Sequence, residues 1–135
     1  MKRPRLRLLG ALLLLAGLLL LTGCGVSARW SGLRIGSVTS QTGDSVFHSC
    51  MEWNGQVVYT IHVREKDQPC LRGDVTLTEG TLSVVLEKKN GEALFREVLE
   101  ADRQLSMVLP KAGTYRIRLE AEGFAGEYRF SWGEE

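Results

Sequence analysis

The stretch KAGTYRIRLEAEGFAGEYRFSW, residues 111–132, shows the pattern that decides the fold. Apolar side chains at Tyr115, Ile117 and Leu119 alternate with polar ones, and the same period of two returns over 128–132. This alternation predicts β-strands with one face buried and the other in solvent. The glycine-flanked segment 123–126 lies between the two runs and predicts a turn that separates the last two strands.

The same alternation continues through the rest of residues 45–135. Its apolar members form three further sets: Val57, Tyr59, Ile61 and Val63; Leu82, Val84 and Leu86; Leu105, Met107 and Leu109. Turn signals separate these sets at Asn54-Gly55, at Asn90-Gly91 and at 110–113. Asn and Gly tolerate the positive φ of tight hairpin turns, so both Asn-Gly pairs predict hairpins.

A two-residue loop at Asn90-Gly91 gives a self-consistent register. It places opposite charges beside the turn and large apolar pairs on one face: Lys89 with Glu92, Leu86 with Phe95, and Leu82 with Leu99. In this register Glu97 shares the apolar face, which predicts a bulge or a strand end near it.

The hairpin at Asn54-Gly55 requires an odd loop. A two-residue loop would place Met51 opposite Val58. A loop over 54–56 instead aligns apolar residues of both strands, namely Phe47, Met51 and Trp53 with Val63, Tyr59 and Val57. We therefore predict the odd loop, because it gives the better core face.

Seven or eight short antiparallel strands predict an all-β domain over 45–135, an antiparallel β-sandwich of jelly-roll-like or Ig-like type, with a small open barrel as the alternative. A helix over 92–105 is the competing interpretation of one segment, because Leu94, Val98 and Leu105 roughly keep helical spacing. Residues 111–132 resemble the last hairpin of jelly-roll-like extracellular accessory domains, such as the bacterial pre-peptidase C-terminal domains. This resemblance rests on glycines, aromatics and alternation, and it implies no catalytic residue.

The N-terminus has a different character from the rest of the chain. Basic residues at Lys2, Arg3, Arg5 and Arg7 precede an uninterrupted run of Leu, Ala and Gly over 8–21. This order is typical of a signal peptide, whose apolar core spans about 7–15 residues, whereas a membrane-spanning helix needs about 20. No basic cluster closes the run as a stop-transfer signal would, although an uncleaved anchor helix remains the alternative.

Leu21-Thr22-Gly23-Cys24 resembles the lipobox of bacterial lipoprotein precursors. The resemblance covers residues 1–24 and implies that Cys24 receives a diacylglycerol and becomes the first residue of the mature chain after cleavage of 1–23. Residues 24–44, rich in Gly, Ser and Thr, then predict a lipidated tether. The implied location is the extracytoplasmic face of a bacterial membrane, with the membrane itself as a partner through the lipid on Cys24.

The distribution of charge indicates that nucleic acid is not a partner. Four of the 17 basic residues precede the apolar run, which leaves 13 against 16 acidic residues from Cys24 onward, a net charge of about −3. A mildly acidic domain with interspersed signs has no electrostatic footprint for nucleic acid.

Cys50 and Cys70 form an even pair once Cys24 is assigned to the lipid. An exported domain meets an oxidising environment, so we predict a disulfide between them, with two reduced thiols as the alternative. The predicted hairpin also places His48 opposite His62, with Cys50 and Glu52 on the same face. Imidazole, thiolate and carboxylate groups bind zinc or copper, so this face is the basis of an alternative hypothesis, a small metal-handling or enzymatic lipoprotein.

The sequence shows no nucleophile elbow and no cysteine nucleophile in a recognisable setting, so we predict a non-catalytic module without a cofactor. Arg72-Gly73-Asp74 is interpreted as turn chemistry rather than as an adhesive motif. Among the aromatics, Trp53 and Trp132 continue apolar sets and are predicted in the core. Phe124, expected at the tip of the last loop, is the candidate ligand-binding residue. The favoured hypothesis is a binding or accessory module for a protein, peptide or glycan of the cell envelope.

Overall fold

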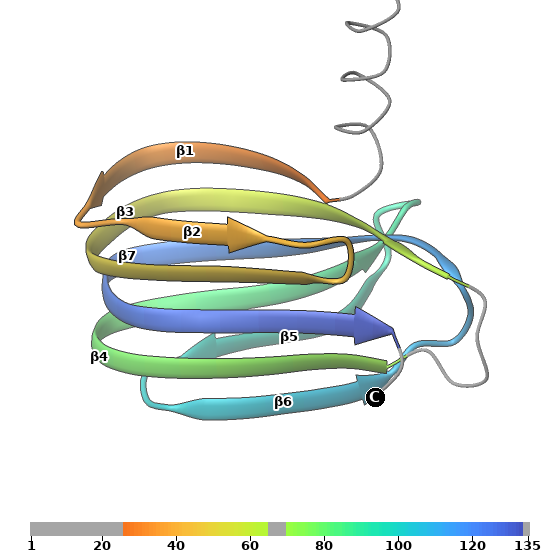
Figure 1. Ribbon diagram of the computed structural model, residues 1–135. Coiled ribbons are helices and arrows are strands. Elements are labelled where there is room, and N and C mark those ends of the chain that lie inside the picture. The colour runs from red at the N-terminus through yellow and green to blue at the C-terminus, as the bar shows by residue number, and fades with distance from the viewer. Residues whose placement is uncertain (1–25, 65–69, 134–135) are drawn as a thin grey trace, which may run out of the picture.

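The computed structural model describes residues 26–64 and 70–133, and these residues form an all-β structure. Figure 1 shows the strands as a sandwich that is closed by their own curvature at one end. The strands are β1 (Ser27–Ile35), β2 (Val38–Gln41), β3 (Ser45–Val63), β4 (Cys70–Lys88), β5 (Ala93–Leu99), β6 (Arg103–Val108) and β7 (Gly113–Gly133). The predicted all-β fold is confirmed, and the segment considered as a helix forms β5 and β6 instead.

Three long strands build both layers of the sandwich. Strands pair antiparallel in the order β1-β3-β7-β4-β5, with β2 added to β3 and β6 to β4. In the front layer, the second half of β7 lies between the first half of β3 and the first half of β4 and pairs with both. Strand β2 flanks β3 on one side of this layer, and β6 flanks β4 on the other. The other halves of the same strands, flanked by β1 and β5, are the back layer.

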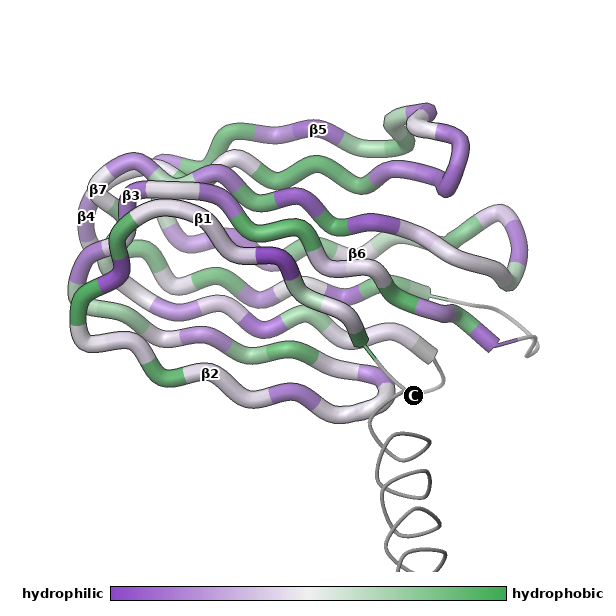
Figure 2. Tube along the Cα trace, turned by 90° about the horizontal axis from the view of Figure 1, so that it is seen from above, coloured by the Kyte–Doolittle hydropathy of each residue, from purple (hydrophilic) through white to green (hydrophobic). Residues whose placement is uncertain are grey.

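Each long strand crosses between the layers at a bend that shifts its register. The shifts lie between Cys50 and Gly55 in β3 and between Leu77 and Thr81 in β4, and both occur opposite residues 121–126 of β7. The bend also changes which residues face inward: in β3 even-numbered residues are buried before it and odd-numbered ones after it. Figure 2 shows the alternation of hydrophobic and hydrophilic residues along the strands.

Glycines make the bend sterically feasible. Gly32 of β1 pairs directly with Gly55 of β3, and a Cβ on Gly32 would lie 2.1 Å from the Asn54 carbonyl oxygen. Such close approach of two backbones excludes any side chain at either position. Asn54 adds a second link, because its Oδ1 accepts a hydrogen bond of 2.8 Å from the Gly123 backbone nitrogen in β7.

Two predicted turns are therefore wrong. Asn54-Gly55 and the segment 123–126 do not reverse the chain; they lie inside the continuous strands β3 and β7. The conformational freedom of their glycines is used to bend a strand rather than to reverse it. Because no hairpin forms at Asn54, Phe47 and Met51 do not share a face with Trp53, and Met51 is 74% exposed.

The hairpin at Asn90-Gly91 is confirmed, but the predicted two-residue loop and its pair of Lys89 with Glu92 are wrong, because Lys88 lies opposite Glu92. Leu86 pairs with Phe95 and Leu82 with Leu99, as predicted. The turn is closed by hydrogen bonds from the Lys88 nitrogen to the Glu92 oxygen, 2.8 Å, and from the Gly91 nitrogen to the Lys88 oxygen, 2.9 Å. The irregularity predicted near Glu97 lies instead between Leu86 and Glu87.

The predicted tether over 24–44 is wrong for most of its length, because β1 and β2 pair with β3 and belong to the sandwich. The predicted start of the domain at 45 is therefore too late. Signal peptide 1–23 and lipidation of Cys24 fall outside the described residues. Among the described residues no helix is long and apolar enough to cross a membrane.

Candidate functional site: a polar groove on the front layer

The outer face of the front layer carries polar side chains in adjoining cross-strand rows. The first row runs over five strands and contains Ser40, Phe47, Arg129, Asp74 and Gln104. The second contains Ser45, Ser131, Arg72 and Ser106. Because neighbouring strands lie about 4.8 Å apart, the side chains in each row form one continuous surface.

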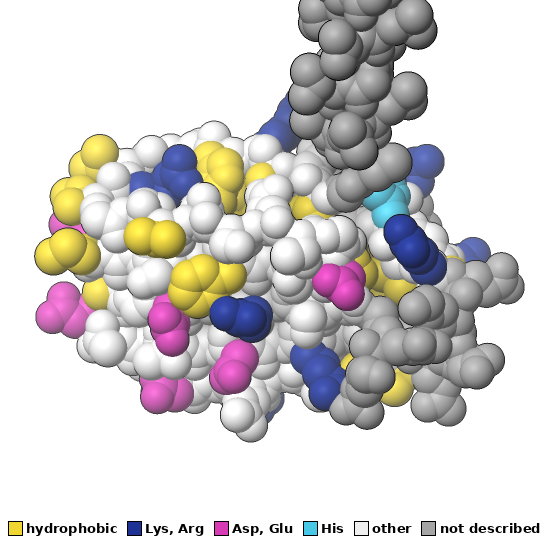
Figure 3. All heavy atoms as spheres, viewed as in Figure 1, with side chains coloured by type: hydrophobic (Ala, Val, Ile, Leu, Met, Phe, Trp, Pro, Cys, Tyr) yellow, Lys and Arg dark blue, Asp and Glu magenta, His cyan; other side chains and the backbone are white. Residues whose placement is uncertain are grey.

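This surface is hollowed. A groove of about 600 Å³ is lined by Arg72, Gly73, Asp74, Gln104, Leu105, Ser106, Arg129 and Ser131, and we call it the polar groove. Figure 3 looks onto this face and shows basic and acidic side chains beside hydrophobic ones near its middle. The lining comes from β4 and from the consecutive strands β6 and β7.

Gly73 allows β4 to pack closely on the core beneath the groove. It lies between Arg72 and Asp74 on β4, and a Cβ at this position would lie 2.7 Å from the Phe130 ring. The missing side chain therefore lets Phe130 pack against the β4 backbone below the groove. Arg72 and Asp74, on either side of Gly73, face solvent because side chains alternate along the strand.

An aromatic ring borders the polar groove. The guanidinium carbon of Arg129 lies 5.2 Å from the centroid of the Phe47 ring, within the range of a cation–π contact. Phe47 is half-buried, so part of its ring stays accessible. The groove thus combines two guanidinium groups, a carboxylate, an amide and two hydroxyls with one apolar edge. Such a set can form paired hydrogen bonds with a ligand rich in hydroxyl groups.

The structure does not bring the predicted metal ligands together. His48 is fully buried opposite Tyr128, whereas His62 is exposed and pairs with Thr114 at the other end of β7. The alternative metal face is wrong because it depended on the hairpin at Asn54. No group of three or more His, Cys, Asp or Glu residues in the described part of the chain could hold a metal ion.

His48 is instead part of an aromatic core. Its Nε2 lies 2.7 Å from the Ser37 hydroxyl oxygen, and its ring centroid lies 4.9–5.2 Å from those of Trp30, Trp53 and Tyr128. Burial, and secondly the positive charge of Arg34, lower the pKa of His48 to about 4. Next to it the Tyr59 and Tyr128 hydroxyls share a hydrogen bond of 2.6 Å, and burial raises the pKa of Tyr59 to about 12.

The predicted disulfide is wrong. Cys50 pairs with Gly126 and Cys70 with Gly133, so the two cysteines lie at positions about 23 Å apart along β7. Both thiols are free. Cys50 is buried, which raises its thiol pKa, and Cys70 lies near the groove with its sulfur 3.7 Å from the Ser106 hydroxyl oxygen.

Phe124 does not lie at a loop tip. It is fully buried at the bend of β7, with its ring centroid 6.3 Å from that of Trp53, so the ring offers no surface to a ligand. The predicted core positions of Trp53 and Trp132 are confirmed, at 0% and 4% exposed. Trp30 is half-buried under the Arg34 guanidinium, whose carbon lies 4.1 Å from the ring centroid.

Sequence reasoning missed the polar groove. The local sequence suggests turn chemistry at Arg72 and Asp74, yet both residues lie in a strand. The available signal was the alternation of Arg72 and Asp74 with Leu71, Gly73 and Val75. That alternation predicts that Arg72 and Asp74 are exposed on one face of a strand, but it does not predict that β6 and β7 are the neighbours of this part of β4.

Comparison with known proteins supports the fold. No family model and no curated protein matches this chain. Among solved structures, this chain is similar to the carbohydrate-binding module TmCBM61 in complex with β-1,4-galactotriose. The match covers 80% of this chain and 88% of the TmCBM61 chain, at 14% sequence identity and a TM-score of 0.51. A mutant of a family 29 carbohydrate-binding module matches 79% of this chain and 89% of its own at 14% identity and a TM-score of 0.40. The likeness to TmCBM61 shows a shared fold, so the predicted jelly-roll-like β-sandwich is confirmed.

Proposed function

We propose that this chain is a lipid-anchored, extracytoplasmic carbohydrate-binding module that holds a glycan in the polar groove. The polar groove itself is the observation that carries the proposal. It presents Arg72, Asp74, Gln104 and Arg129 from neighbouring strands on one accessible surface, and Phe47 borders it. Sugar rings carry vicinal hydroxyls that accept and donate hydrogen bonds in pairs, together with apolar C–H faces that pack on aromatic rings.

The fold is compatible with this use. TmCBM61, which shares the fold, was solved with β-1,4-galactotriose bound. A β-1,4-linked galactan is therefore the first polymer to test. The groove of about 600 Å³ lies within the size range of sites for small ligands.

Anchoring follows from the lipobox resemblance. Because β1 begins at Ser27, three positions after Cys24, a lipid on Cys24 would hold the sandwich close to the membrane surface. One acyl chain binds a membrane only marginally, whereas two or more hold it stably. Mass spectrometry of the Cys24 peptide from bacterial membranes tests this part, and a Cys24→Ala variant that stays equally membrane-bound after cleavage of 1–23 would contradict it.

Glycan binding is tested by affinity electrophoresis of the full chain in neutral detergent, through gels that contain β-1,4-galactan or other soluble polysaccharides. We expect retardation of the unchanged chain and about tenfold weaker binding for Asp74→Ala and Arg129→Ala, because each removes charge-assisted hydrogen bonds. The control is Arg96→Ala on the outer face of the back layer, which removes the same charge as Arg129→Ala.

Two results would contradict the proposal. One is free migration of the unchanged chain in every polysaccharide gel. The other is a loss of retardation in Arg96→Ala as large as in Arg129→Ala, because the binding would then depend on charge rather than on the polar groove.

A further inference from the structure

All three lysines of the described residues lie at one place. Lys88 and Lys89 end β4, and Lys111 precedes β7; together they line a second concavity of about 360 Å³ with Asn90 and 112–115. We call this concavity the lysine pocket. Every other permanently cationic side chain in the described part of the chain is an arginine.

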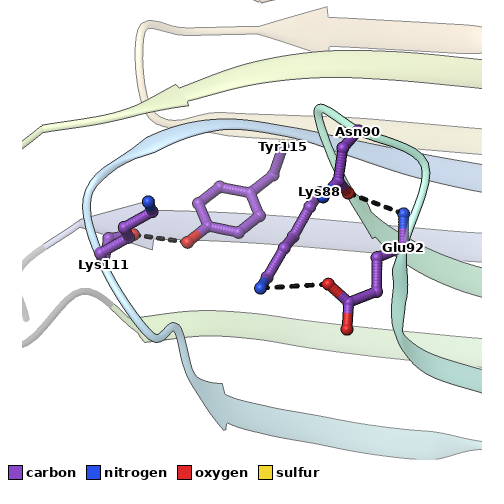
Figure 4. A network of polar contacts seen from close by, with 5 residues as sticks. All are labelled: Lys88, Asn90, Glu92, Lys111 and Tyr115. Carbon is purple, nitrogen blue, oxygen red and sulfur yellow. Dashed lines mark hydrogen bonds and ion pairs between the residues drawn. The ribbon is translucent and has the colours of Figure 1, made fainter.

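Hydrogen bonds fix the two loops that form the lysine pocket. Figure 4 shows the Tyr115 hydroxyl donating to the Lys111 carbonyl oxygen and the Glu92 backbone nitrogen donating to Asn90 Oδ1 over 2.9 Å. On the other side of the turn, Arg116 donates to the Lys89 carbonyl oxygen over 3.1 Å. Both loops thus hold their lysines with little freedom of the backbone.

The charges of the lysine pocket are only partly neutralised. Lys88 Nζ forms an ion pair of 3.2 Å with Glu92, which lies on the same hairpin. Among the described residues, neither Lys89 nor Lys111 forms an ion pair through its side chain. Three lysines thus line the pocket and one of them is paired with a carboxylate, so the pocket favours an anion with several oxygen acceptors.

The lysine pocket lies at the same end of the sandwich as the start of β1. Ser27, Thr60, Arg116 and Glu87 form one cross-strand row, and Lys88 follows Glu87 directly. In this row Ser27 lies about 14 Å from β4 along the sheet. Figure 1 shows the start of β1 and the turn between β4 and β5 at one end, opposite the bends.

We infer that the lysine pocket binds a phosphate group and that, in the anchored protein, this phosphate belongs to the headgroup of an anionic phospholipid. The second part rests on the proposed lipidation of Cys24, which would bring this end of the sandwich to the membrane. Lysine suits this ligand, because its compact charge binds phosphate without a fixed geometry. A lipid contact at this end would leave the polar groove, on the side of the sandwich, open to a glycan.

Lysine acetylation of the full chain tests this inference. The chain is reconstituted into vesicles of phosphatidylglycerol or of phosphatidylcholine, treated with an acetylating reagent, and analysed by mass spectrometry at Lys89 and Lys111. We expect about fivefold slower acetylation in phosphatidylglycerol, the change that corresponds to about 1 kcal/mol per lysine near an anionic surface. In a second arm, inorganic phosphate is added to the chain in neutral detergent, without any anionic lipid.

Variants separate the lysine pocket from general charge. In Lys111→Gln we expect the protection of Lys89 to fall, whereas in Arg96→Gln, which removes the same charge from the back layer, we expect it to persist. Equal loss in both variants would overturn the inference.

The arms also separate the two sources of phosphate. Protection by phosphatidylglycerol supports the headgroup. If inorganic phosphate protects the lysines and phosphatidylglycerol does not, the lipid headgroup is ruled out as the ligand and a site for free phosphate remains. If neither arm shows protection, the whole inference is overturned. The mass of the Cys24 peptide from the same digest shows whether the anchor is present, so a failed anchor is distinguished from a failed pocket.

Discussion

The two outer faces of the sandwich are made from the same three long strands, yet they are built differently. On the back layer, Arg29, Val58, Arg118, Val85 and Arg96 form one cross-strand row in which arginines alternate with valines. Arg118 lies 3.1 Å from the carboxylate of Glu87, so one of these charges is already paired. On the front layer, the corresponding row combines Arg129, Asp74 and Gln104 beside Phe47, and its centre is hollow.

This difference shows that the number of charges does not make a site. The back row has three arginines against two in the groove, but the branched side chains of Val58 and Val85 lie between them. The front face instead has Asp74, Gln104 and two serines between its arginines, and the groove lies among these side chains. The space left open, more than the charge, distinguishes the front face as a binding surface.

The largest expected difference between the layers concerns pH. His48 lies inside the front layer and its pKa is lowered to about 4, whereas His62 lies exposed on the back layer. As pH falls below 6.5, His48 becomes protonated in the unfolded chain but stays neutral in the folded chain. The contribution of His48 to the free energy of unfolding is therefore full above pH 6.5 and is lost progressively as the pH falls towards 4. We expect a loss of about 3 kcal/mol in the free energy of unfolding, measured by urea denaturation.

Substitution at each histidine provides the control. His62→Gln should keep the acid-dependent loss, and His48→Gln should abolish most of it. An unchanged pH dependence in His48→Gln would mean that another group carries the effect.

The next largest effect is expected at Gly73. Gly73→Ala places a Cβ 2.7 Å from the Phe130 ring, and such overpacking costs roughly 1–3 kcal/mol in the free energy of unfolding. Ser106→Ala, on the solvent side of the neighbouring strand, should change stability by less than about 0.5 kcal/mol. If the two variants unfold at the same urea concentration, Phe130 does not pack beneath the groove as described.

A smaller effect is expected for the ion pair of the back layer. The Glu87 side chain is 11% exposed and that of Arg118 is 39% exposed, so solvent screens their attraction only in part. Glu87→Gln should lower the free energy of unfolding by about 1 kcal/mol and leave retardation in polysaccharide gels unchanged. Altered retardation in this variant would show that the two faces are coupled.

The smallest effect on stability is expected at the contact between Arg129 and Phe47. Because this contact is at the surface, Phe47→Leu should cost only about 0.5–1 kcal/mol. The same variant should weaken glycan binding if the ring packs on a sugar, and this is measured by affinity electrophoresis. Unchanged binding would remove Phe47 from the site while leaving the polar residues in place.

The sequence predicted the alternating segments better than their connections. Tyr115, Ile117 and Leu119 are buried as expected. Asn90-Gly91 turns the chain, and the strands pair in the predicted register from Leu86 onward, although not at the turn itself. At Asn54-Gly55 the same residue pair lies inside a strand, because a glycine that permits a turn also permits a bend. The local sequence does not distinguish these outcomes; the difference arises from pairing with Gly32 and with β7.

This single misinterpretation accounts for most errors at the site. A strand that continues through a bend inverts the expected face of every residue on one side of it, so His48 moved inward and Phe47 outward. The polar groove could not be predicted either, because β4 and β7 are far apart in sequence and alternation does not identify a strand's neighbour.

The continuity of β3, β4 and β7 through both layers has a consequence for binding. A strand that belongs to two layers cannot detach from one without disturbing hydrogen bonds in the other, so partial opening of the front face is energetically linked to the back. The groove is thus held rigid in the unbound protein, and a ligand need not supply the free energy for ordering it. We therefore expect the whole sandwich to unfold in a single cooperative transition, with slow amide exchange in β4 and β7 beneath the groove even when no ligand is present.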